Sequence, residues 1–198
     1  AISNAVGGDI IAFDGKTLRR SFDNATGMSA IHVMNAWSNA NDFCLGQMKV
    51  DGKSNEITAM PELIKLLDIK GSVVTADALN CQKDIAEQII DSGGDYVFAL
   101  KGNHPLLYED TKLFFDDALC DGFDVSYGFY DQDDYGHGRV ENRKYYCAEV
   151  DNLDFLRNKD EWKGLKTIVC VESRRQTRDA ESVERRFFIS SLDKINLI

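Results

Sequence analysis

The chain has 198 residues, of which 43% are hydrophobic and 28% charged, and its formal net charge at pH 7 is −10. This is the composition of an ordinary globular protein that can bury a sizeable core. No apolar run approaches the ~18 residues of a membrane span, and no signal-peptide pattern opens the sequence. The five cysteines are scattered without a C-x-x-C pair, so we expect reduced thiols and neither a zinc site nor a disulfide framework.

The acidic charge is concentrated in one segment. Residues 109–134 carry nine acidic side chains against one base, Lys112, whereas residues 135–186 carry twelve bases against ten acids. We expect the acidic block to form a solvated helix and loop, as such runs usually do. The negative total does not favour extensive contacts with nucleic-acid phosphates, because such contacts come from Lys and Arg.

The first fifty residues are predicted to form three strands, at residues 9–14, 30–38 and 43–50. A short polar turn at residues 39–42 separates the second strand from the third. Short connections of this kind favour an antiparallel meander.

Helices and strands alternate in the next fifty residues. Helical spacing begins at residue 57, a strand is predicted at 72–76, an amphipathic helix at 81–92 and a buried strand at 96–100. The strand-helix-strand unit must be parallel and right-handed. Three antiparallel strands followed by parallel strands with helices make an α/β fold with a ribonuclease-H-like mixed sheet.

Two aspartates in this layout directly follow apolar runs. Asp14 follows residues 9–13, and Asp77 follows residues 72–76. If the two strands are neighbours, both carboxylates lie at the same edge of the sheet. Mg²⁺ prefers such oxygen ligands, and a pair of ions can clamp the attacking and leaving oxygens of a phosphoryl transfer. Turn aspartates of purely structural origin are the alternative interpretation.

The second half of the chain is predicted to be mainly β after an acidic helix at about residues 104–119. Strands are expected at residues 145–150, 166–172 and 185–190. We expect three parts. Residues 1–120 form the first part of a ribonuclease-H-like catalytic core, and residues 121–193 form a mainly β insertion or extension of the same domain. Residues 194–198 are the start of a truncated C-terminal segment.

Six short motifs occur in order, at residues 14–19, 50–57, 75–78, 81–86, 99–103 and 136–141. In combination they resemble the H-repeat-associated proteins, a branch of the bacterial insertion-sequence DDE transposases, over essentially the whole chain. The resemblance implies a ribonuclease-H-like core that cleaves DNA and transfers its strands. It implies Asp14 and Asp77 as catalytic metal ligands, with two Mg²⁺ or Mn²⁺ ions in the complete enzyme. Double-stranded DNA at the element's ends, a homodimer and the bacterial cytoplasm, in association with the nucleoid, are the partners and location to be expected.

Side chains that contact DNA are predicted from cations and polar groups beside these motifs: Lys16, Arg19, Lys101, Asn103, His137 and Arg139. The first two follow Asp14, the next two follow a buried strand, and the last two alternate along a strand between glycines. Glu141, in the same alternation, could serve as a substitute third carboxylate, but we interpret it as part of a surface salt-bridge strand. Glu56 is interpreted as a helix-start acid.

The family's third carboxylate lies in a His-Trp-x-Ile-Glu helix, and this sequence contains no such segment. We therefore expect an internal fragment that is inactive alone. A catalytically dead remnant that acts as a DNA-binding or assembly domain is the main alternative. A haloacid-dehalogenase-type phosphatase is rejected, because its Asp-x-Asp pair would need an aspartate where Ala12 or Lys16 stands.

Overall fold

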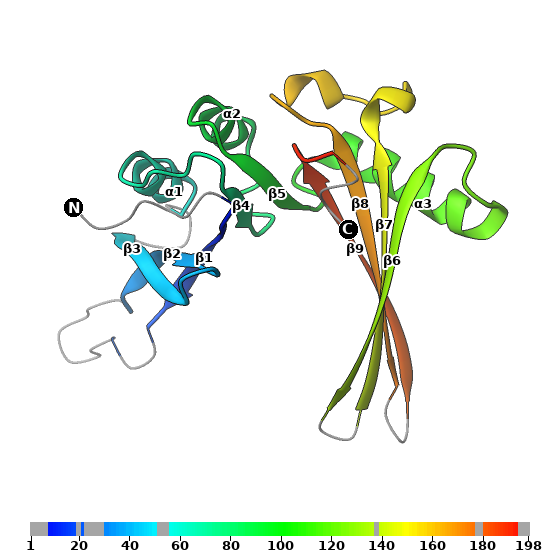
Figure 1. Cartoon of the computed structure of the whole chain (residues 1–198), viewed down its shortest axis with the longest axis horizontal. Coiled ribbons are helices and arrows are strands. Elements are labelled where there is room, and N and C mark those ends of the chain that lie inside the picture. Colours follow the sequence, from blue (N-terminus) through cyan, green and yellow to red (C-terminus); the bar gives the residue numbers. More distant parts are fainter. Residues whose placement is uncertain are drawn as a thin grey trace. The chain divides into compact units, whose positions relative to one another are not determined.

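The computed structural model describes residues 8–18, 21, 30–50, 56–136, 139–176 and 180–193. The chain forms two compact units, Ala1–Phe98 and Ala99–Ile198 (Figure 1). Within the described residues, no helix has both the length and the apolar character that crossing a membrane requires.

The first unit is built on a sheet with the strand order β3-β2-β1-β4-β5. Its strands are β1 (Ile10–Thr17), β2 (His32–Ser38), β3 (Phe43–Val50), β4 (Val73–Ala76) and β5 (Asp95–Leu100). The pairs β1–β2 and β2–β3 are antiparallel, whereas β1–β4 and β4–β5 are parallel. The predicted fold class is therefore confirmed, with a meander followed by parallel strands.

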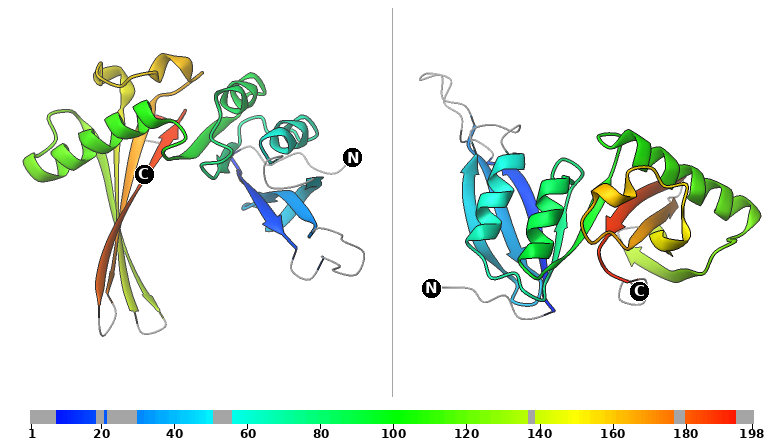
Figure 2. Two further views of the ribbon diagram at one scale, coloured as in Figure 1. Left: turned by 180° about the vertical axis from the view of Figure 1, so that it is seen from behind. Right: turned by 90° about the horizontal axis from the view of Figure 1, so that it is seen from above.

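Two helices, α1 (Glu56–Lys65) and α2 (Lys83–Asp91), lie on one face of this sheet (Figure 2). Each helix buries one apolar stripe, which includes Met60 and Leu63 in α1 and Ile85 and Ile89 in α2. The close approach of α1 to the sheet is visible at Gly46 of β3, where an added Cβ would lie 3.0 Å from the Leu63 side chain. Burying side chains of this size contributes roughly 1.5–3 kcal/mol each.

Strand β1 is longer than the sequence predicts. Its pairing with β4 ends at Phe13↔Ala76, but its pairing with β2 continues through Asp14↔Asn35 to Thr17↔His32. The predicted end at residue 14 is wrong, because the antiparallel neighbour keeps the backbone extended after the parallel neighbour has turned away. Asp14 therefore lies inside a strand and beyond the end of a parallel ladder.

The second unit is an antiparallel sheet with the order β9-β8-β7-β6, preceded by helix α3 (Pro105–Asp121). The strands are β6 (Tyr127–Gly136), β7 (Arg139–Glu149), β8 (Thr167–Gln176) and β9 (Glu181–Ser190), and they form a long twisted ribbon (Figure 1). The short 3₁₀ turns η2 (Val150–Asn152) and η3 (Lys159–Glu161) lie between β7 and β8. The predicted mainly β second half is confirmed.

One expectation about this unit is wrong. The acidic residues 127–134 were expected in a helix or loop, but they form most of β6. They pair in register with β7, with Asp131 opposite Lys144 and Asp133 opposite Asn142. Asn142 also donates side-chain hydrogen bonds to both aspartates, at 2.6 and 2.9 Å.

Aromatic side chains and an ion pair hold α3 in the second unit. The ring of Phe187 in β9 lies 6.2 Å from that of Phe115 and 5.7 Å from that of Tyr108, both in α3. Asp110 in α3 is buried and accepts hydrogen bonds from the guanidinium and the backbone N–H of Arg157. The Arg157 hydrogen bonds hold the pKa of the Asp110 carboxyl below its usual value.

Candidate active site

Asp14 and Asp77 both lie at the carboxyl end of the parallel β1–β4 ladder in the first unit. Each is the residue immediately after the last parallel pair of β1 and β4, Phe13↔Ala76. Both side chains are exposed, whereas Ile11 and Phe13, which alternate with Asp14 along β1, are buried. The structure thus confirms that the two strands are adjacent and parallel, with Asp14 within β1 and Asp77 directly after β4.

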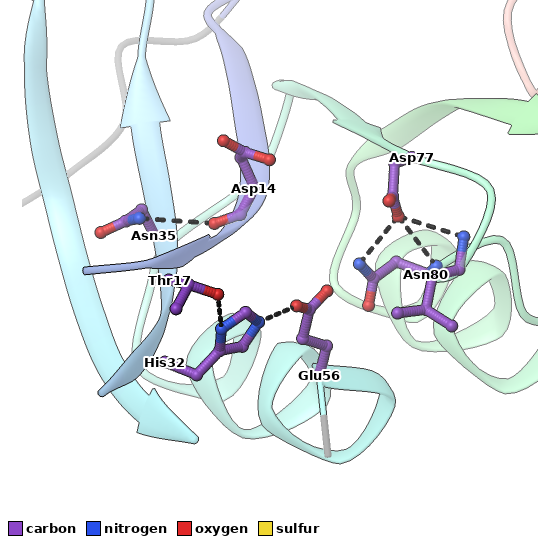
Figure 3. A network of polar contacts seen from close by, with 8 residues as sticks. Asp14, Thr17, His32, Asn35, Glu56, Asp77 and Asn80 are labelled. Atoms are coloured by element: carbon purple, nitrogen blue, oxygen red, sulfur yellow. Dashed lines mark hydrogen bonds and ion pairs between the residues drawn. The ribbon is translucent and has the colours of Figure 1, made fainter. Parts of the chain in front are cut away.

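The Asp77 carboxylate is fixed by the turn that follows β4. Its Oδ1 accepts hydrogen bonds from the Leu79 N–H at 3.1 Å, the Asn80 N–H at 3.2 Å and the Asn80 Nδ2 at 3.1 Å (Figure 3). Oδ2 accepts no hydrogen bond from any residue that the structure describes. Three donors on one oxygen orient the carboxylate and leave the other oxygen for a ligand.

Asn80 was not singled out from the sequence, although it is part of this geometry. Its side chain is fully buried, and its Oδ1 has no hydrogen-bond partner among the described residues. A buried side chain that orients a metal-ligating carboxylate typically affects metal affinity without touching the metal. The sequence signal for this role is an Asn side chain three residues after an aspartate, a spacing that is also common in simple turns.

Asp14 borders an open groove on the sheet face opposite α1 and α2. The groove has a volume of about 400 Å³ and is lined in part by Asp14, Lys16, Asn35, Trp37 and Gln47. Asn35 donates to the Asp14 carbonyl at 3.4 Å and accepts from Gln47 at 2.7 Å. The Asp14 carboxylate itself makes no hydrogen bond or ion pair within the described segments, so its lone pairs face solvent.

A buried polar chain supports β1 directly behind Asp14. The Glu56 carboxylate lies over Gly15 so closely that a Cβ added there would be 2.3 Å from it. Glu56 is paired with Nε2 of His32, and the Nδ1 of His32 is 2.6 Å from the Thr17 hydroxyl (Figure 3). Glu56 does start α1, as predicted, but its carboxylate faces His32 and Gly15. The role of His32 was missed, although a glycine within a strand can indicate such a close approach.

The donor set suits a hard cation. Two exposed carboxylates on neighbouring strands match the one or two protein carboxylates by which Mg²⁺ is usually held together with substrate phosphates. The nearby Cys81 thiol does not add a soft ligand, because burial and the negative charge of Asp77 raise its pKa to about 12. Within the described ranges, no group of three or more His, Cys, Asp or Glu residues is arranged to hold a metal ion.

The predicted DNA-contacting residues are placed unevenly. Lys16 is exposed on the same face of β1 as Asp14, and Lys101 and Asn103 are exposed after β5. Arg19 and His137 lie outside the described residues. The backbone of Arg139 in β7 pairs with that of Gly136 in β6, but the side chain of Arg139 is not among the described parts of the structure.

Glu141 forms ion pairs on a strand, as interpreted, but its expected surface position is wrong. Its side chain is only 6% exposed, and its two oxygens face Arg143 at 2.7 Å and Arg175 at 3.6 Å. The carboxylate is buried because Arg175 lies opposite it on β8 and Arg143 follows it on the same face of β7. A carboxylate held by two guanidinium groups is poorly suited to be a third metal ligand.

Comparison with known proteins identifies related chains. The family model described as Transposase DDE domain matches residues 6–186. The H repeat-associated putative transposase YhhI of Escherichia coli (strain K12) is 42% identical over 191 residues, which are 93% of this chain and 49% of that protein. The putative transposase YncI of Escherichia coli O157:H7 is 42% identical over 189 residues, 94% of this chain and 48% of that protein.

An uncharacterized protein in the dhlA 3' region of Xanthobacter autotrophicus is 43% identical over 189 residues, 94% of this chain and 62% of that protein. The chain thus spans less than two thirds of the length of each of these relatives. Among solved structures, a piggyBac transposase synaptic complex with hairpin DNA aligns with a TM-score of 0.46 and 12% identity, over 95% of this chain and 34% of that one. That likeness is too weak to bear on the fold.

Proposed function

Because the chain belongs to the transposase DDE domain family, we propose that it carries two carboxylates of a metal-dependent site that cleaves and joins DNA. Asp14 and Asp77 are the proposed metal ligands. The observation that supports this proposal is the end of the β1–β4 ladder at Phe13↔Ala76, because the next residue of each chain segment is an exposed aspartate.

Each residue of this site has a distinct role in the proposal. The aspartates bind the metal, and Asn80 orients Asp77 through Oδ1 so that Oδ2 is presented outward. Lys16, exposed on the same face as Asp14, offers a cation to a phosphate oxygen. Mg²⁺ or Mn²⁺, when bound, supplies Lewis-acid stabilisation of the charge that develops on the phosphoryl oxygens. Phosphoryl transfer depends chiefly on such positioning and charge stabilisation, so rigid support of both carboxylates is central.

The proposed partners follow from the family. Double-stranded DNA at the ends of an insertion element is the substrate, and Lys101, Asn103, Arg19, His137 and Arg139 remain predicted DNA contacts. Action as a homodimer on bacterial DNA in the cytoplasm also remains a prediction.

Titration calorimetry with Mn²⁺ and Mg²⁺ tests the metal site directly. We expect the chain to bind Mn²⁺ and the Asp14→Asn and Asp77→Asn variants to bind at least ~10-fold more weakly, because each removes a charged ligand. Asp84→Asn is the matched control, since Asp84 is an exposed aspartate in the first turn of α2. Equal binding by wild type and Asp77→Asn would remove Asp77 from the site.

Cleavage of duplex DNA that bears the element's ends separates catalysis from the DNA-binding or assembly alternative. Cutting by residues 1–198 in Mn²⁺ that is lost in Asp14→Ala would assign a further acid to this chain. Metal binding without any cut would favour the alternative for these residues. A cut that survives in Asp14→Ala would exclude Asp14 from catalysis.

A further inference from the structure

A second polar site lies on the sheet of the second unit, on one face of β7, β8 and β9. It is a groove of about 450 Å³. Strand pairing arranges its side chains in three rows across the sheet, which are Glu141–Arg175–Ser182, Arg143–Ser173–Glu184 and Tyr145–Val171–Arg186. The three arginines therefore stand on neighbouring rows of a single face.

Glu141 orients two of these arginines. Arg143 donates to Glu141 Oε1 through Nε at 3.1 Å and Nη2 at 2.7 Å, while Arg175 lies 3.6 Å from Oε2. The carboxylate is buried, but the side chains of Arg143 and Arg175 are 38% and 49% exposed. Among the described residues, Nη1 of Arg143 donates no hydrogen bond, and Arg175 is beyond hydrogen-bond distance of its partner. The buried acid thus holds two cations in place without using all of their donors.

The net charge of the groove-lining residues indicates an anionic ligand. Three arginines against Glu141 and Glu184 leave one net positive charge among the lining residues. The positive surroundings hold the pKa of Glu184 below its usual value. The main cause is hydrogen bonding from Arg186, and the charges of Arg186, Arg175 and Lys101 act in the same direction. A phosphodiester carries a single negative charge, whereas a phosphoserine carries about −1.5 to −2. Planar guanidinium groups suit the recognition of phosphate oxygens.

We infer that this groove binds a phosphodiester group of a nucleic-acid strand through Arg143, Arg175 and Arg186. The hydroxyl groups of Ser173 and Ser182 are further donors in the same groove. The choice of nucleic acid over other phosphate esters rests on the proposed function. The site uses neither Asp14 nor Asp77 and needs no metal.

Fluorescence anisotropy with a labelled duplex, in EDTA, tests this site without involving the metal site. The Arg143→Gln/Arg175→Gln double variant should bind about 10-fold more weakly, and its salt slope between about 50 and 200 mM should fall by about 1, as for the loss of one phosphate contact. Arg186→Gln leaves both partners of Glu141 in place, so it tests the groove if the double variant fails to fold. It should bind several-fold more weakly.

Arg174→Gln is the matched control. Arg174 precedes Arg175 in β8, points to the opposite face, and is paired with Glu181 at 3.5 Å. The Arg174→Gln variant should bind the duplex with an affinity within about 2-fold of wild type. Duplex binding by the Arg186→Gln and double variants that equals the control would overturn the site. Displacement of the duplex by a phosphoserine peptide as readily as by an unlabelled oligonucleotide would overturn the nucleic-acid assignment. Failure of metal binding in the calorimetry would leave these results unchanged, so the two proposals fail separately.

Discussion

The carboxylates at the end of the β1–β4 ladder and those on the β7–β9 face have opposite environments. At the ladder end, Asp14 and Asp77 are exposed, and neither forms an ion pair within the described residues. On the face, Glu141 is 4% exposed and lies between two guanidinium groups. Asp14 and Asp77 Oδ2 therefore have lone pairs available for the proposed metal ion, whereas the oxygens of Glu141 face protein cations.

Glu56 shows that this contrast also holds within the first unit. It is 3% exposed and paired with His32, although it lies directly behind Gly15, the neighbour of Asp14. Buried acids therefore act as internal support, whereas the exposed acids at the ladder end are the proposed metal ligands. The following predictions test that division, beginning with the largest expected effect.

Gly15→Ala should break the support behind Asp14. The added Cβ would lie 2.3 Å from the Glu56 carboxyl, so either the strand or the buried pair must shift. We expect a loss of about 3 kcal/mol in the free energy of unfolding, measured by urea denaturation. Gly102→Ala is the control, because nothing lies within 4 Å of its added Cβ. Equal stability of the two variants would show that Glu56 does not support β1.

Asn80→Ala should weaken metal binding while leaving both aspartates in place. The change removes the side-chain donor to Asp77 Oδ1 at 3.1 Å, so the carboxylate loses part of its orientation. We expect about 10-fold weaker Mn²⁺ binding by calorimetry. Gln82→Ala serves as a comparison, since Gln82 donates to the Leu79 carbonyl of the same turn without reaching Asp77. If both variants bind Mn²⁺ as wild type does, Asn80 has no part in the metal site.

Asp110→Asn should lower thermal stability at neutral pH but not in acid, as expected for a buried acid that supports the fold. Arg157 lowers the pKa of Asp110 below the ordinary value of 3.8, so the charged form stabilises the fold above that value. This contribution is lost as the pH falls through the lowered pKa. We expect the Tm at neutral pH to fall by about 2–4 °C in the variant, and the difference to close below pH ~3.8. A difference that persists unchanged in acid would exclude the charge as its cause.

Asp14→Asn should have the smallest effect on stability. The carboxylate is exposed and has no described ion-pair partner, so its neutralisation should change the free energy of unfolding by less than about 0.5 kcal/mol. Thermal unfolding without metal is the measurement. A large loss would class Asp14 with the supporting acids.

The sequence predicts most of the fold because its signals are local. Apolar runs and helical spacing located the strands and helices of the first unit, and the two aspartates were recognised because each follows such a run. Strand β6 was missed because exposed aspartates interrupt its apolar alternation, and its pairing with β7 becomes evident only in the structure. The Glu56–His32 and Glu141–Arg175 pairs were missed because strand register and helix packing, which join distant residues, create them.

The acidic residues of β6 have a consequence for solubility. Within the described strands, β6 is the last of its sheet, so its outer N–H and C=O groups could pair with another chain. The strand also exposes large aromatic side chains, Tyr127, Phe129, Tyr130 and Tyr135. Asp131, Asp133 and Asp134 place three negative charges among them, and two such edges would repel each other on approach. The acidic stretch thus opposes edge-to-edge pairing of β6 with another chain.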